Sequence, residues 1–158
     1  MKRDPGSLRV GRILTARDFS ISRRDLEAHV ESSFLVDVVG CCEERLSTGS
    51  HVAVPSDAGA GWGRVCPDAV VVGKAIAALV GDLGPARPVG HTVARVRRLG
   101  PVMVGEPLSA VATVRFRSDR DTRASLVTMD VSVQRAGGGT RLQFELALEV
   151  EHLALDAA

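Results

Sequence analysis

The sequence is poor in aromatic residues, cysteine and net charge, and each shortage excludes a class of protein. It has no tyrosine, one tryptophan and four phenylalanines among 158 residues. Its three cysteines, of which Cys41 and Cys42 are adjacent, offer neither a disulfide framework nor the paired spacing of a zinc site. The formal charge of +1 gives no electrostatic basis for binding nucleic acid. We therefore expect reduced thiols in a cytoplasmic protein, with no metal and no other cofactor.

The sequence also has no apolar run long enough to cross a bilayer. The most apolar segment, AVVVGKAIAALV (residues 69–80), is shorter than a membrane span and carries Lys74. The first twelve residues, MKRDPGSLRVGR, are charged and lead into no apolar run, unlike a signal peptide. Because no repeat or linker divides the sequence, we expect one domain over residues 1–158, with no membrane partner.

The first half predicts a strand and two helices separated by a long connection. Residues 12–21 predict a short strand, and residues 22–31 predict a helix that opens with Ser22 and Asp25 as a variant of the capping box. Residues 32–64 are irregular and rich in glycine, and such connections usually cover the core or carry function. Pro67 fits the first position of a second helix, which is apolar nearly all round to residue 80. We expect this helix to be buried on all sides.

The second half alternates apolar and polar residues, as half-buried antiparallel strands do. Three apolar sets recur at every second position: Leu108, Ala110, Ala112, Val114 and Phe116; Val127, Met129, Val131 and Val133; Leu142, Phe144, Leu146, Leu148 and Val150. The stretches SDRDT and AGGGT predict hairpin turns, and VGHTVARVRRL predicts one more strand. The sum is an α+β protein in which a curled antiparallel sheet wraps round one buried central helix, the outline of the hot-dog fold.

Four segments, taken in chain order, carry a family resemblance: GRILTARDFSISRRDLEAHV, HVAVPSDAGAGWGRVCPDAVV, RRLGPVMVGEPLSAVATV and GGGTRLQFELALEV. They resemble MaoC-like hot-dog proteins, the relatives of (R)-specific enoyl hydratases and 3-hydroxyacyl dehydratases. The resemblance implies a lyase that acts at the α,β-position of an enoyl or 3-hydroxyacyl thioester. The thioester would be carried on coenzyme A or an acyl carrier protein, as in polyketide or fatty-acid-type biosynthesis. The resemblance also implies a homodimer with active sites near its interface.

The family's catalytic motif, roughly Gly-Asp-x-Asn-Pro-apolar-His, is incomplete here. When the Gly-Trp-Gly turns are aligned, His51 stands where the family has its histidine, but Leu46 replaces the aspartate. Hydration needs one group to activate water and one to deliver a proton, so a carboxylate must come from elsewhere or His51 must do both. We take His51 and Asp37 as the catalytic residues, with Glu43 and Glu44 as other sources of the carboxylate. The alternative for His51 is an exposed loop histidine.

The resemblance places the rest of the site at the start of the second helix. Backbone groups of Gly63, Arg64, Val65 and Cys66 would bind the thioester carbonyl, because helix starts offer unpaired N–H groups and a positive dipole. Trp62 and His91 would line the substrate channel. The alternatives are an ordinary capped helix start, a tryptophan that packs the loop, and a structural histidine.

Two other functions fit the same residues. A hot-dog thioesterase would use Asp37, Glu43 or Glu44 to activate water for hydrolysis of an acyl thioester. A non-catalytic acyl-binding or regulatory subunit would pair with an active MaoC-like chain, and the missing aspartate at Leu46 favours this alternative.

Overall fold

The computed structural model describes residues 8–32, 65–84, 86–120 and 123–152. These ranges hold five strands and two helices, which lie in the chain order β1 (Ile13–Phe19), α1 (Arg23–Ser32), α3 (Asp68–Val80), β2 (Ala86–Arg98), β3 (Leu108–Asp119), β4 (Ala124–Arg135) and β5 (Thr140–His152). Neither helix in these ranges has the length and apolar character needed to cross a bilayer.

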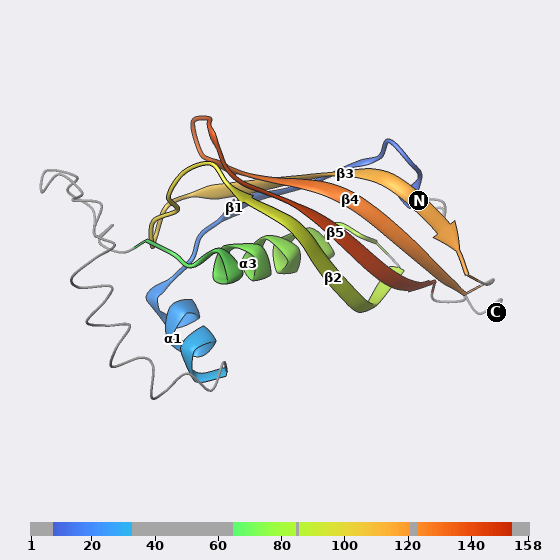
Figure 1. The fold of residues 1–158 in the computed structure, drawn as a ribbon, viewed down its shortest axis with the longest axis horizontal. Helices are drawn as coiled ribbons and strands as arrows, with labels where there is room; N and C mark the ends of the chain where they lie inside the picture. Colours follow the sequence, from blue (N-terminus) through green and yellow to red (C-terminus); the bar gives the residue numbers. More distant parts are fainter. Residues whose placement is uncertain (1–7, 33–64, 85, 121–122, 153–158) are drawn as a thin grey trace, which may run out of the picture.

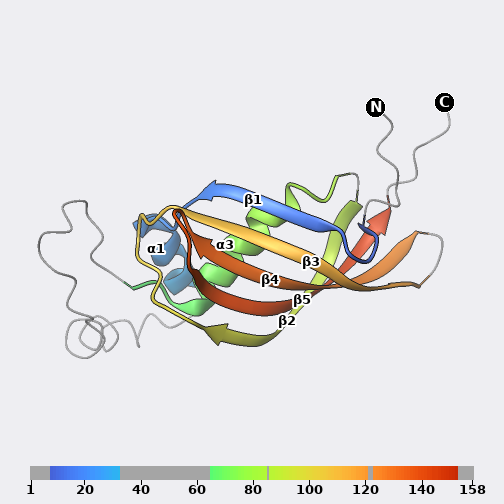
Figure 2. The same ribbon diagram turned by 90° about the horizontal axis from the view of Figure 1, so that it is seen from above.

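The five strands form one antiparallel sheet in the order β1-β3-β4-β5-β2. The sheet is curled, and α3 lies against its concave face, while α1 lies near the start of α3 (Figures 1 and 2). This arrangement confirms the predicted α+β class and the curled antiparallel sheet round a central helix. The strands β1 and β2 are the two edges of the sheet.

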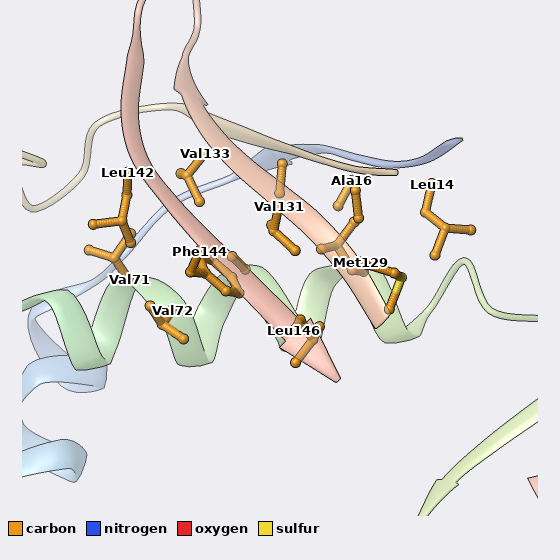
Figure 3. Packing of buried hydrophobic residues seen from close by; sticks show 14 of the residues in the cluster. Leu14, Ala16, Val71, Val72, Met129, Val131, Val133, Leu142, Phe144 and Leu146 are labelled. Carbon is orange, nitrogen blue, oxygen red and sulfur yellow. The ribbon is translucent and has the colours of Figure 1, made fainter. Parts of the chain in front are cut away.

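The core lies between the concave face and α3. Every member of the predicted sets on β4 and β5 is buried, as are the first four members of the set on β3. Figure 3 shows Phe144 and Leu142 from the sheet directed toward Val71 and Val72 of α3. Period-two alternation therefore predicted the buried face of three strands, because successive side chains of a strand point to opposite faces.

Phe116 is the exception to the alternation. Val114 pairs with Met129, but Phe116 pairs with Thr128, so the register slips by one residue between them. A one-residue slip turns the following side chains to the other face of the sheet. Phe116 is consequently 54% exposed, and the prediction that it continues the buried set is wrong.

The second helix also differs from its prediction. Pro67 is the residue before the helix, with an extended backbone (φ −60°, ψ 144°), and the helix begins at Asp68. One face of α3 is buried, whereas Ala69, Gly73 and Ala77 on another face are exposed. The expectation of burial on all sides is therefore wrong for the described residues, because the sheet covers α3 from one side only.

The first helix forms as its sequence predicts. The hydroxyl of Ser22 accepts the N–H of Asp25 at 3.2 Å, and Oδ2 of Asp25 accepts the N–H of Ser22 at 2.8 Å. These reciprocal bonds are the predicted capping box. Asp25 also pairs with Nζ of Lys74 at 2.8 Å, so the cap of α1 is joined to α3 by an ion pair.

Candidate functional site

The start of α3 is the part of the predicted site that the structure describes best. Val65 forms an isolated bridge with Met103, and the N–H of Cys66 donates to the carbonyl oxygen of Val102 at 2.7 Å. The chain that enters α3 is therefore paired with the loop between β2 and β3. The N–H of Cys66 is already used, so it is not available to a substrate carbonyl.

The first turn of α3 still offers backbone donors. The N–H groups of Asp68 and Ala69 belong to that turn, where a helix has no acceptor of its own. Neither N–H donates a hydrogen bond to a backbone carbonyl in the part of the chain that the structure describes. Donors of this kind, together with the positive end of the helix dipole, stabilise negative charge on an oxygen. The structure thus moves the candidate donors from Cys66 to the two residues after Pro67.

An arginine neutralises the acidic side chain at this helix start. Nε of Arg98 donates to Oδ1 of Asp68 at 2.7 Å, and Nη2 of Arg98 donates to the carbonyl oxygen of Cys66 at 3.3 Å. An unpaired Asp68 carboxylate would repel an oxyanion that develops beside it. The guanidinium of Arg98 offsets that repulsion. Sequence reasoning missed this role, since Arg98 ends the basic stretch RVRR (residues 95–98), and such a stretch is typical of a solvated strand face.

Cys66 itself is buried, with 1% of its surface exposed. Burial raises the pKa of its thiol from an ordinary 9.0 to about 11, and the nearby charge of Glu106 acts in the same direction. The thiolate is the nucleophilic form of cysteine, so a thiol with this pKa is inert at neutral pH. Cys66 is therefore a packing residue at the helix start.

A buried carboxylate lies in the loop between β2 and β3, whose backbone pairs with Val65 and Cys66. Glu106 is 1% exposed; its Oε2 accepts the N–H of Met103 at 2.9 Å, and its Oε1 lies 3.2 Å from Nε of Arg135. The sequence shows Glu106 only as part of a Gly-Glu turn. Its position between Val104 and Leu108, in an otherwise apolar stretch, is the one local signal of burial.

His91 lies on the edge strand β2, opposite Leu148 of β5, and it is exposed. Arg98, the last residue of β2, contacts Asp68 at the start of α3, and His91 lies seven residues earlier on the same strand. At about 3.3 Å per residue, the distance between them along β2 is on the order of 20 Å. The structure therefore does not bring His91 to the helix start, and its channel role stays a prediction.

The remaining predicted site residues, His51, Asp37, Trp62, Gly63 and Arg64, lie outside the described residues. Within the described ranges, no group of histidine, cysteine, aspartate and glutamate side chains could hold a metal ion.

No family model matches the sequence, and comparison with curated proteins finds no match either. Solved structures do match the fold. The R-hydratase PhaJ1 from Pseudomonas aeruginosa is 18% identical, with 94% of this chain and 84% of that chain covered and a TM-score of 0.58. The truncated HadBC 3R-hydroxyacyl-ACP dehydratase complex from Mycobacterium tuberculosis is 18% identical, with 94% and 99% covered and a TM-score of 0.61.

A third similar structure has a different activity. A point mutant of the fluoroacetyl-CoA-specific thioesterase FlK is 17% identical, with 92% of this chain and 89% of that chain covered and a TM-score of 0.52. Identities of this size show the fold alone. The fold of this chain is thus the hot-dog fold of (R)-hydratases and MaoC-like dehydratases, as its sequence segments predicted.

Proposed function

We propose that the protein is an enzyme of hydratase or dehydratase type, which adds water to, or removes it from, an acyl thioester at the α,β-position. The observation that carries the proposal is the start of α3, where the N–H groups of Asp68 and Ala69 have no described backbone acceptor and Arg98 neutralises the adjacent carboxylate. Such a site suits a thioester carbonyl, whose oxygen gains negative charge during the reaction.

In the direction of hydration, His51 accepts a proton from water while the water oxygen bonds to the β-carbon. The electron pair of the C=C bond moves toward the thioester oxygen, where the N–H groups of Asp68 and Ala69 stabilise the enolate. His51 then delivers its proton to the α-carbon, which completes the addition of water. Asp37 orients His51, and Trp62 and His91 line the acyl channel. Removing one donor from an oxyanion hole typically raises the barrier by about 2.7–4 kcal/mol.

The proposed carrier of the acyl group is coenzyme A or an acyl carrier protein, in polyketide or fatty-acid-type biosynthesis. The proposed assembly is a homodimer, supported by the edge position of β2 and by three exposed apolar side chains on or beside it: Val89, Val96 and Leu99. Sedimentation at micromolar concentration should give a dimer, and a monomer at that concentration contradicts this part of the proposal.

The thioesterase activity of FlK favours hydrolysis of an acyl thioester as the second candidate, because it occurs on the same fold. Asp37, Glu43 or Glu44 would then activate the water. A non-catalytic acyl-binding or regulatory subunit is the third candidate, supported by Leu46 at the position of the family's aspartate.

One assay separates the three candidates. The purified protein is incubated with a 2-enoyl thioester of coenzyme A while the conjugated enone absorbance and free thiol are both followed. A fall in the enone absorbance without release of free thiol supports hydration, and release of free thiol supports hydrolysis. No change in either signal supports the non-catalytic subunit. His51→Ala should abolish the enone loss, whereas Phe116→Ala on the convex face should preserve it. An unchanged rate in His51→Ala contradicts the site assignment.

A further inference from the structure

The loop between β2 and β3 (residues 99–107) contacts three segments at the end of the sheet where α3 begins. The N–H groups of Leu99 and Gly100 donate to the carbonyl oxygen of Arg141 on β5, at 2.8 and 3.1 Å. The N–H of Gly105 donates to the carbonyl oxygen of Ile21, just before α1, at 2.9 Å. Together with the hydrogen bond from Cys66, these contacts make the loop the junction of α1, α3 and the sheet.

Glu106 is the buried charge inside this junction. Both of its carboxylate oxygens are used, Oε2 by the N–H of Met103 and Oε1 by Nε of Arg135. Nη2 of Arg141 lies 3.8 Å from the same Oε1, and Nε of Arg141 is buried with no hydrogen-bond partner among the described residues. Arg141 thus depends on Glu106 for compensation of its charge. The side chain of Glu106 is 2% exposed, whereas those of Arg135 and Arg141 are 43% and 25% exposed, so the carboxylate is the buried charge that the two guanidinium groups compensate.

Met103 connects the Glu106 cluster to the chain segment that leads into α3. Met103 donates its N–H to Glu106, and it is the residue that bridges Val65 on the approach to α3. One residue earlier, Val102 accepts the N–H of Cys66. One side-chain hydrogen bond therefore joins the carboxylate to Met103, and two backbone pairings, Met103 with Val65 and Val102 with Cys66, join the loop to the residues just before α3. Hydrogen-bond geometry allows these pairings little freedom to shift.

We propose that Glu106 is a positioning residue, which fixes the start of α3 by holding the loop of residues 99–107 between Arg135 and Arg141. That the positioned site binds a thioester rests on the proposed function. That Glu106 fixes the start of α3 does not depend on it. Neutralising Glu106 loosens the loop, and the pairing of Val65 and Cys66 with it loosens as well. The first-turn donors of α3 then lose their fixed direction.

Amide hydrogen exchange measured on the full chain tests this role. In Glu106→Gln, exchange at the amides of Met103 and Cys66 should accelerate at least about tenfold relative to Val131 at the centre of the sheet, the change expected when a hydrogen bond to a charged group is lost. Glu106→Asp keeps the charge on a shorter side chain and should give an intermediate ratio.

Ser125→Ala is the matched control. Ser125 is also 1% exposed, and its hydroxyl donates to Asp119 at 2.6 Å, but it lies at the opposite end of β4. Ser125→Ala should leave the ratio of Cys66 to Val131 exchange unchanged. A uniform acceleration of all three amides in Glu106→Gln overturns the proposal, because it shows only a loss of global stability. If Glu106→Gln does not fold, an unchanged ratio in Glu106→Asp overturns it equally.

A kinetic readout accompanies the exchange. With a 2-enoyl thioester, Glu106→Gln should lower kcat about tenfold and change KM less than about twofold, since misdirected donors weaken the transition state more than substrate binding. A rise in KM with an unchanged kcat, which lowers kcat/KM by the same factor, contradicts the positioning role. If the wild-type protein turns over no thioester, the proposed function fails, whereas the exchange ratio still decides the role of Glu106.

Discussion

The centre of the sheet and the end where α3 begins are held together by different forces. At the centre, β4 and β5 present only apolar side chains to α3, and all of those in the predicted sets are buried. At the end, Arg98 pairs with Asp68 in the first turn of α3, and the buried Glu106, in the loop that contacts Val65 and Cys66, pairs with two arginines. Burial of apolar surface has no preferred direction, whereas ion pairs and hydrogen bonds fix geometry. The centre therefore supplies stability, and the polar end supplies a defined backbone geometry at the proposed site.

The largest effect is expected from a cavity at the centre. Leu146 is fully buried on β5, and Leu146→Ala should lower the free energy of unfolding by about 2–5 kcal/mol, through lost burial and the cavity left behind. Urea denaturation of the variant and the wild type measures it. A loss under about 1 kcal/mol would mean that the centre does not supply the stability assigned to it.

The next effect concerns the thiol at the polar end. A rise in the pKa of Cys66 from 9.0 to about 11 lowers its thiolate fraction at neutral pH about a hundredfold. In a Cys41→Ser, Cys42→Ser background, alkylation by iodoacetamide at neutral pH should be slower by this factor in the folded protein than in urea. Equal rates in the folded and unfolded chains would show that Cys66 is not enclosed at the helix start.

A smaller effect is expected at the cap of α1. Although burial acts to raise it, hydrogen bonds from Lys74 and Ser22 lower the pKa of Asp25 from 3.8 to about 2. Because the folded pKa is the lower one, Asp25 stabilises the protein above about pH 4, and this contribution is lost as the pH falls toward 2. Asp25→Ala should cost about 1 kcal/mol at neutral pH.

The pH dependence distinguishes this ion pair from a general loss of helix. The difference in stability between wild type and Asp25→Ala, measured by thermal unfolding, should shrink as the pH falls from about 4 to about 2. Ser22→Ala, which leaves the Asp25–Lys74 pair in place, should cost less than Asp25→Ala. A difference that is constant across this pH range contradicts the assignment.

The smallest effect is expected from the largest side chain in the series. Phe116→Ala should change the free energy of unfolding by less than about 1 kcal/mol, because the bulge places Phe116 on the convex face. A buried phenylalanine would cost about 3–5 kcal/mol. A loss in that range would show that Phe116 continues the buried set after all.

The same contrast explains what the sequence could predict. Alternation on β4 and β5 is a local pattern, so the buried faces, the hairpins and the curled sheet followed from the sequence. The bulge at Phe116 is a property of pairing between two strands, and no local pattern records it. Glu106 meets Arg135 and Arg141 only after the sheet has formed, and the N–H of Cys66 is used only because Val102 lies beside it.

The most direct test of the proposed division between centre and polar end is to map where an acyl thioester binds. Backbone amide shifts are followed by NMR while a saturated acyl-coenzyme A, which cannot be hydrated, is titrated into the protein. We expect the amides of Asp68 and Ala69 to shift most among the described residues, and those of Thr113 and Ser132 on the convex face not to shift. Binding whose largest shifts fall on the convex face, with Asp68 and Ala69 unmoved, would contradict the proposed site.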